Sequence, residues 1–105
     1  MTEKRSPTYD LEAIKKAFSQ PPGLTVTTTA LRTASVLGFG RQEIVDTIQT
    51  IRGAHFYKSM TSFADFRIWQ DVYHVPSSAG ILYVKFTAGV VSEFLLLSFK
   101  EKDNE

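Results

Sequence analysis

The spacing of apolar residues changes once along this chain, near Gly53, and that change limits the folds available to it. Before Gly53, apolar residues recur at the three- and four-residue spacing of amphipathic helices. After it, β-branched and aromatic residues gather in short segments separated by polar or glycine-containing breaks, as is typical of strands. Helices followed by strands predict an α+β fold, with an antiparallel β-sheet and about three N-terminal helices packed on one face.

The expected helices span residues 10–19, 28–37 and 41–51. Pro21-Pro22-Gly23 stops the first helix, because proline cannot continue one, and Gly38 and Gly53 follow the other two. The expected strands span residues 55–63, 67–75, 81–88 and 90–100. Their connections are short, so we expect an antiparallel meander.

The chain of 105 residues is long enough for one domain, 1–105, in which we expect residues 1–7 and 103–105 to be flexible. A formal net charge of +1 excludes the global basic field of a bulk nucleic-acid binder, so any anion site must be a local cluster. The absence of cysteine excludes disulfides and thiolate metal sites. A polar start and no apolar run near ~20 residues predict a cytoplasmic protein without membrane contact.

Alternation along the expected strands assigns side chains to the two faces of the sheet. The apolar rows are Leu82, Val84 and Phe86 in one strand and Leu95, Leu97 and Phe99 in the next. The opposite face, away from the helices, then carries Lys58, Gln70, Tyr83 and Lys100. The same alternation sends Asp71 into the core, where a carboxylate needs hydrogen-bond partners, unless a β-bulge changes the register.

Histidine chemistry has two candidates, His55 and His74, on adjacent strands. Neither has a second histidine or an acid at ligand spacing, so we expect no metal site. Hairpin pairing centred near residue 65 would bring the two together, which leaves a two-histidine ribonuclease mechanism open. A triad of Ser59, His74 and Asp71 can also be composed, but no strained nucleophile turn accompanies it.

Basic residues form the other candidate site, in which Lys58, Lys85 and Lys100, together with Arg67, bind a phosphate. RNA cleavage requires that the 2′-hydroxyl lose a proton, that charge on the phosphoryl group be neutralised and that the leaving 5′-oxygen be protonated. Clustered lysines neutralise charge, and a lysine whose pKa is lowered from ~10.4 by burial or a nearby cation can also act as a base. Taken singly, each lysine fits a solvated sheet face better than a ligand site. Aromatic residues able to stack on bases likewise fit apolar packing better, namely Tyr57, Trp69 and Tyr73.

Five strings stand in order along the chain: Glu3-Lys4-Arg5, Phe56-Tyr57-Lys58-Ser59-Met60-Thr61, Ile68-Trp69-Gln70-Asp71-Val72-Tyr73, Leu82-Tyr83-Val84-Lys85 and Ser98-Phe99-Lys100-Glu101-Lys102. Together they make the chain similar to the MqsR family of bacterial toxin endoribonucleases over nearly its whole length. The likeness is weakest between Gln20 and Gly40. The acidic tail beyond Lys102 extends slightly past the family's usual end.

This resemblance implies a fold similar to the RelE and YoeB ribonuclease toxins. It also implies ribosome-independent cleavage of mRNA, without a metal or other cofactor, at a short triplet such as GCU. The family's catalytic residues match Lys58, Gln70, Tyr83 and Lys100, and we add Lys85 and Arg67 as RNA-binding contacts. The implied partner is an MqsA-like antitoxin with a zinc-binding N-terminal domain and a DNA-binding C-terminal domain.

We therefore expect a type II toxin that leaves a 2′,3′-cyclic phosphate or 3′-phosphate and a 5′-hydroxyl. Lys58 and Lys100 would hold and neutralise the scissile phosphate, while Tyr83 would position it or act as acid or base. Gln70 would orient the ribose or a base. The alternative is a non-catalytic module that binds RNA or protein on the same sheet.

Overall fold

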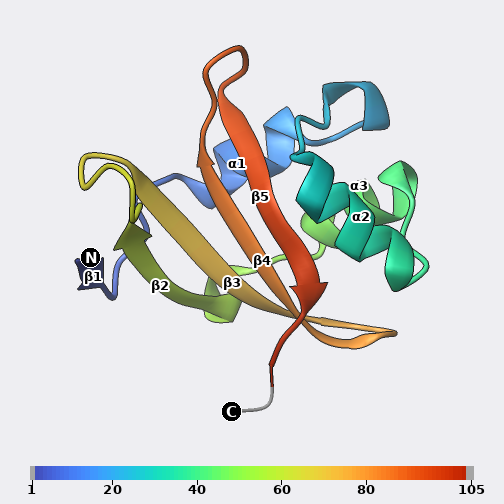
Figure 1. Cartoon of the computed structure of the whole chain (residues 1–105). Helices are drawn as coiled ribbons and strands as arrows, with labels where there is room; N and C mark the ends of the chain where they lie inside the picture. The colour runs from blue at the N-terminus through green and yellow to red at the C-terminus, as the bar shows by residue number, and fades with distance from the viewer. Residues whose placement is uncertain (1, 104–105) are drawn as a thin grey trace.

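The computed structural model describes residues 2–103, and Figure 1 shows how their helices and strands are arranged. The helices are α1 (Leu11–Ala17), α2 (Thr28–Val36) and α3 (Arg41–Gln49). The strands are β1 (Glu3–Lys4), β2 (Phe56–Thr61), β3 (Trp69–Ser77), β4 (Gly80–Ala88) and β5 (Phe94–Glu101). The α+β class is confirmed. The sheet has five strands where the sequence predicted four, because residues 3–4 pair with β2.

The two ends of the chain were expected to be flexible. Residue 1 and residues 104–105 lie outside the described residues. Residues 3–4 form β1, and the flexibility of the first seven residues stays a prediction. Within residues 2–103, no helix has the length and apolar character needed to cross a membrane.

Each helix begins where the sequence supplies a cap. The side chains of Asp10 and Thr27 accept hydrogen bonds from the backbone N–H three residues further on, at the start of α1 and α2. At α3 the carboxylate of Glu43 instead accepts from the N–H of Gly40, at 2.8 Å. Gly38 has a φ of 87° after α2, a conformation that glycine adopts without steric cost.

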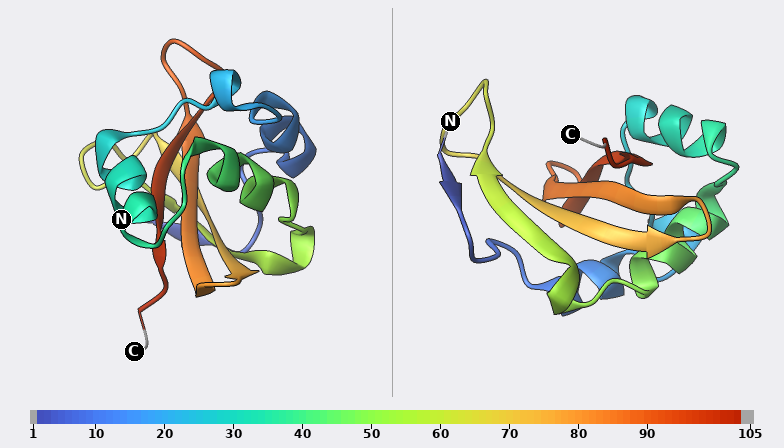
Figure 2. Two further views of the ribbon diagram at one scale, coloured as in Figure 1. Left: turned by 90° about the vertical axis from the view of Figure 1, so that its right-hand side faces the viewer. Right: turned by 90° about the horizontal axis from the view of Figure 1, so that it is seen from below.

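The strands lie in the order β1-β2-β3-β4-β5, each antiparallel to its neighbour. Figure 2 shows the strong twist of the sheet, and in Figure 1 the ribbon of α1 passes behind β4 and β5. One core joins the helical half to one sheet face. Its buried residues include Ile14, Phe18, Ala30, Ala34, Ile44, Val45 and Ile48, which pack with Tyr73, Val75, Leu82, Val84, Phe86, Leu96 and Phe99.

The opposite sheet face, called the open face below, carries the side chains that alternate with this core. It holds Lys58, Met60, Gln70, Val72, His74, Tyr83, Lys85, Thr87, Ser98 and Lys100. All four polar residues that alternation assigned to the face away from the helices lie on it, and Leu82, Val84 and Phe86 are buried on the core side as predicted.

The predicted apolar row of β5 is wrong in part, because a β-bulge interrupts the strand. The register passes from Lys85 opposite Ser98 to Phe86 opposite Leu96, which leaves Leu97 as the extra residue. Leu96 is therefore buried, whereas Leu95 and Leu97 are half-buried. A second bulge lies between Phe56 and Lys58 in β2 and resets alternation there as well.

Asp71 is fully buried on the core side of β3, and its partners come from the N-terminal segment. Its carboxylate accepts hydrogen bonds from the backbone N–H of Thr8 at 3.0 and 3.1 Å and of Tyr9 at 2.8 Å. Ser59, its cross-strand neighbour, shares a 2.8 Å hydrogen bond with the Thr8 hydroxyl. These bonds tie residues 8–9 to the sheet and place the preceding residues where β1 pairs with β2.

Replacing Asp71 by alanine should destabilise the fold, because the N–H groups of Thr8 and Tyr9 would lose their acceptor. We expect Asp71→Ala to lower the free energy of unfolding by about 3 kcal/mol, measured by urea denaturation. The control is Asp46→Ala, on the exposed side of α3, which should cost about 0.5 kcal/mol or less. Equal losses in the two variants would contradict the anchoring role of Asp71.

Candidate functional site

Cross-strand pairing brings the polar side chains of the open face into two adjacent rows. In one row, Tyr83 of β4 lies between His74 of β3 and Lys100 of β5. In the next row, Lys85 lies between Val72 and Ser98, and Lys58 of β2 is paired with Val72. Directly opposed residues of antiparallel strands have Cβ atoms about 4.5–5.5 Å apart, so the two rows bring polar side chains from four strands together around the buried Val72.

Three of the four residues predicted as catalytic line a single cleft on the open face, called the main cleft below. Its volume is about 370 Å³, and its lining is Tyr57, Lys58, His74, Tyr83, Lys100, Lys102 and Asp103. The Lys100 ammonium lies 5.3 Å from the centre of the Tyr83 ring. Three lysines against one carboxylate make this cleft suited to an anion.

Gln70, the fourth predicted residue, is on the open face but does not line the main cleft. It pairs with Met60 and Thr87, two residues along β3 from Val72. Diagonal neighbours on a sheet are about 7–8 Å apart, which places Gln70 one step from Lys58 along the face. Its half-buried amide is therefore positioned to contact a part of a ligand that extends beyond the main cleft.

The two predicted secondary contacts differ in position. Lys85 is half-buried on the open face, and burial, followed by repulsion from Lys100, lowers its pKa. Arg67 lies in the connection between β2 and β3, where its Nε is 3.1 Å from the Asp65 carboxylate. Lys85 therefore shares the open face with the predicted catalytic residues, whereas Arg67 lies on a connection, and neither residue lines the main cleft.

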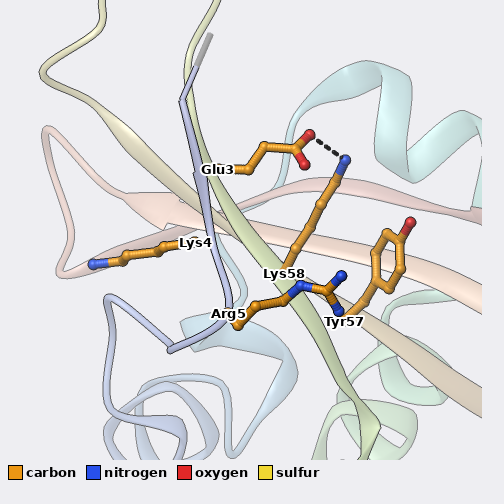
Figure 3. A pocket seen from close by; sticks show the side chains of 5 residues that line it. All are labelled: Glu3, Lys4, Arg5, Tyr57 and Lys58. Atoms are coloured by element: carbon orange, nitrogen blue, oxygen red, sulfur yellow. Dashed lines mark hydrogen bonds and ion pairs between the residues drawn. The ribbon is translucent and has the colours of Figure 1, made fainter.

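Lys58 has a partner that sequence reasoning missed. Its ammonium is 2.6 Å from the carboxylate of Glu3, which β1 presents beside β2 (Figure 3). This hydrogen bond raises the pKa of Lys58, so the side chain carries a positive charge at neutral pH. The string Glu3-Lys4-Arg5 was the feature of the sequence that could have indicated this partner. Its structural role could not be predicted, because the contact joins residues more than fifty positions apart.

The β2 bulge places Tyr57 beside Lys58 at the main cleft. The Tyr57 ring stacks on His74, with ring centres 4.2 Å apart and an interplanar angle of 22°. Tyr57 is 45% exposed, whereas Tyr73 is buried in the core, where desolvation raises its pKa to about 12. Trp69 is half-buried beneath the Lys4 ammonium, 4.4 Å from its ring. Of these three aromatics, Tyr57 alone is available to a ligand in the main cleft.

The two histidines are placed differently, and no catalytic pair forms. His55 accepts a hydrogen bond at Nδ1 from the backbone N–H of Arg52 and does not line the main cleft. His74 lies inside it, with its ring centre 6.2 Å from that of Tyr83. Burial, followed by repulsion from Lys102 and Lys58, lowers the pKa of His74. Since an unperturbed histidine titrates near ~6.5, its imidazole is neutral at pH 7.

The pKa of Tyr83 is shifted in the opposite direction to that of His74. Burial raises the pKa of the Tyr83 hydroxyl, which therefore stays protonated at neutral pH. The main cleft thus combines cationic ammonium groups, a phenol able to donate a proton and an imidazole able to accept one. Within residues 2–103, no group of three or more histidine, aspartate or glutamate residues is arranged to hold a metal ion.

Residues 6–101 match the family described as motility quorum-sensing regulator, toxin of MqsA. The mRNA interferase toxin MqsR of Escherichia coli (strain K12) is 39% identical over 100 residues, which are 95% of this chain and 99% of that protein. The family match includes the four strands that line the main cleft. The chain therefore belongs to the MqsR toxin family.

Proposed function

We propose that this protein is an mRNA interferase, an endoribonuclease toxin that cuts single-stranded mRNA and is neutralised by a cognate antitoxin. The observation that carries the proposal is the meeting of Lys58, Tyr83 and Lys100 in one cleft. Support comes from the E. coli relative, which is named an mRNA interferase toxin, and from the family description as the toxin of MqsA.

The lysine ammonium groups of the main cleft bind the scissile phosphate and neutralise its charge. When the 2′-hydroxyl attacks phosphorus, negative charge builds on the non-bridging oxygens, and preorganised donors lower the energy of that state. Lys58 is suited to this task because the Glu3 carboxylate raises its pKa and holds its ammonium in place. Lys100, at the far side of Tyr83, binds the same phosphate from β5.

Proton transfer falls to Tyr83 and His74. The neutral imidazole of His74 accepts the proton of the attacking 2′-hydroxyl, and its stacking on Tyr57 fixes the orientation of the ring. The protonated Tyr83 hydroxyl donates to the leaving 5′-oxygen. Bond formation at the 2′-oxygen and cleavage of the 5′-oxygen bond leave a 2′,3′-cyclic phosphate and a 5′-hydroxyl.

Finer features implied by the family resemblance belong to this proposal. Gln70 orients the ribose or a base next to the cleavage site, and Lys85 contacts the RNA backbone. The reaction uses neither metal nor ribosome and favours a triplet such as GCU. The fold is similar to RelE and YoeB, the antitoxin is MqsA-like with zinc-binding and DNA-binding domains, and the toxin acts in the cytoplasm. Arg67 as an RNA contact also belongs to this proposal; its guanidinium pairs with Asp65, and the residue does not line the main cleft.

A cleavage assay distinguishes the enzyme from a non-catalytic RNA-binding module. Purified protein is incubated in EDTA with a single-stranded RNA that contains GCU, and the products are separated by size. We expect cleavage by the wild type and a loss of about 10²–10³-fold in kcat for Lys58→Ala, because a transition-state donor is removed. RNA that is retained by the wild type but never cut would establish the module instead.

Replacing Tyr83 by phenylalanine removes the hydroxyl and keeps the ring. We expect Tyr83→Phe to lower kcat by about 10²–10⁴-fold, as for loss of a general acid. Tyr83 is half-buried at the main cleft, and the ring that packs there is kept in the variant, so the midpoint of thermal unfolding should change by only about 1–2 °C. A large fall in that midpoint with little loss of kcat would make Tyr83 a structural residue.

His74 should give activity and stability a common pH dependence. Because the pKa of His74 is lowered on folding, the unfolded chain binds its proton more readily, and stability falls as pH drops below the unfolded value near ~6.5. Activity should also fall as the pH drops through the lowered pKa of His74 in the folded protein, because the base becomes protonated. His74→Gln should lower kcat by about 10²-fold at pH 7.5 and remove the acidic limb of the pH–rate profile.

The matched control for this prediction is His55→Gln, since His55 lies outside the main cleft. It should keep the wild-type pH–rate profile. An unchanged acidic limb in His74→Gln would show that another group accepts the proton.

A further inference from the structure

A second cleft opens on the other side of Lys58, between β1 and β2. It has a volume of about 270 Å³ and is lined by Glu3, Lys4, Arg5, Tyr57 and Lys58. Tyr57 and Lys58 line the main cleft as well, so the two clefts meet at these two side chains. A ligand that extends out of the main cleft past Lys58 therefore enters the second one.

Arg5 supplies the available charge of this second cleft. Figure 3 shows its guanidinium next to Tyr57, while Lys4 points away from both. The Lys4 ammonium lies over Trp69, and Glu3 is bound to Lys58. Arg5 is exposed and belongs to neither of the ion pairs found within residues 2–103.

The chemistry of Arg5 favours a phosphate. A guanidinium presents two parallel N–H groups to an oxyanion, which gives both energy and orientation. The Glu3 carboxylate in the same cleft does not oppose this, since its charge is offset by Lys58 at 2.6 Å. Three cationic residues and one carboxylate line the cleft and leave it positive.

We propose that the second cleft is a binding subsite for the RNA backbone, in which Arg5 holds the phosphate of a nucleotide adjacent to the cleavage site. This inference rests on the proposed function, because it assumes that the main cleft holds the scissile phosphate. Glu3 acts as a positioning residue, which keeps Lys58 at the junction of the two clefts. β1 thus extends the RNA-binding surface by one strand beyond β2.

The first measurement is equilibrium binding of Arg5→Ala to a short single-stranded RNA that carries a 2′-deoxy sugar at the cleavage position and so cannot be cut. We expect the Kd to rise about tenfold, as for loss of one charge-assisted contact. The slope of log Kd against log salt should fall by about 0.7, the value for one phosphate of a single strand. The control is Arg32→Ala, an exposed arginine on α2, which should leave both quantities unchanged.

The second measurement uses cleavable RNA of one length, in which the linkages that flank the scissile phosphate are either phosphates or uncharged methylphosphonates. Arg5→Ala should raise KM for the phosphate strand about tenfold with little change in kcat, and should match the wild type on the strand with uncharged flanking linkages. A wild-type Kd and KM for Arg5→Ala, or an equal loss on both strands, would overturn the subsite.

The two measurements separate this inference from the proposed function. Wild-type protein that binds RNA and never cuts it refutes the enzyme, while the Kd of Arg5→Ala still decides whether the second cleft binds the backbone. Wild-type protein that fails to bind the strand refutes both.

Discussion

The buried carboxylate of Asp71 connects the packing of this fold to its chemistry. A charge fully removed from water needs strong donors, and the N–H groups of Thr8 and Tyr9 supply them. Because these donors lie far from Asp71 in sequence, satisfying the carboxylate also draws the N-terminal segment onto the sheet. The segment then continues as β1, which delivers Glu3 to Lys58.

The titratable groups of the open face have different surroundings, which shift their pKa values in different directions. Lys58 sits against a carboxylate and stays charged, while burial keeps the Tyr83 hydroxyl protonated and the His74 imidazole neutral. Position moves each of these pKa values further from neutrality than its ordinary value, which makes the three protonation states more complete at pH 7. Cleavage of a phosphodiester by its own 2′-hydroxyl requires cations that neutralise the phosphate, a proton donor and a proton acceptor. The main cleft holds all three kinds of group.

The β-bulges determine how these components meet. In β2, the extra residue at Tyr57 lets Phe56 face the core and Lys58 the open face, with Tyr57 stacked on His74 beside the main cleft. In β5, the extra residue at Leu97 lets Leu96 and Phe99 both enter the core while Lys100 stays opposite Tyr83. Bulges of this kind re-aim side chains at functional sites without ending the strand.

Local patterns in the sequence were sufficient for the helices, four strands and the face on which Lys58, Gln70, Tyr83 and Lys100 lie, because periodicity and alternation depend on neighbouring residues. The strings around these residues were also sufficient to indicate the family. Tertiary structure alone decided that Glu3 joins Lys58, that Arg5 borders a second cleft, that Gln70 stands apart from the main cleft and that Arg67 lies outside it. It also decided the partners of Asp71 and the burial of Leu96. Each of these depends on contacts between distant segments or on a bulge, for which spacing along the chain carries no signal.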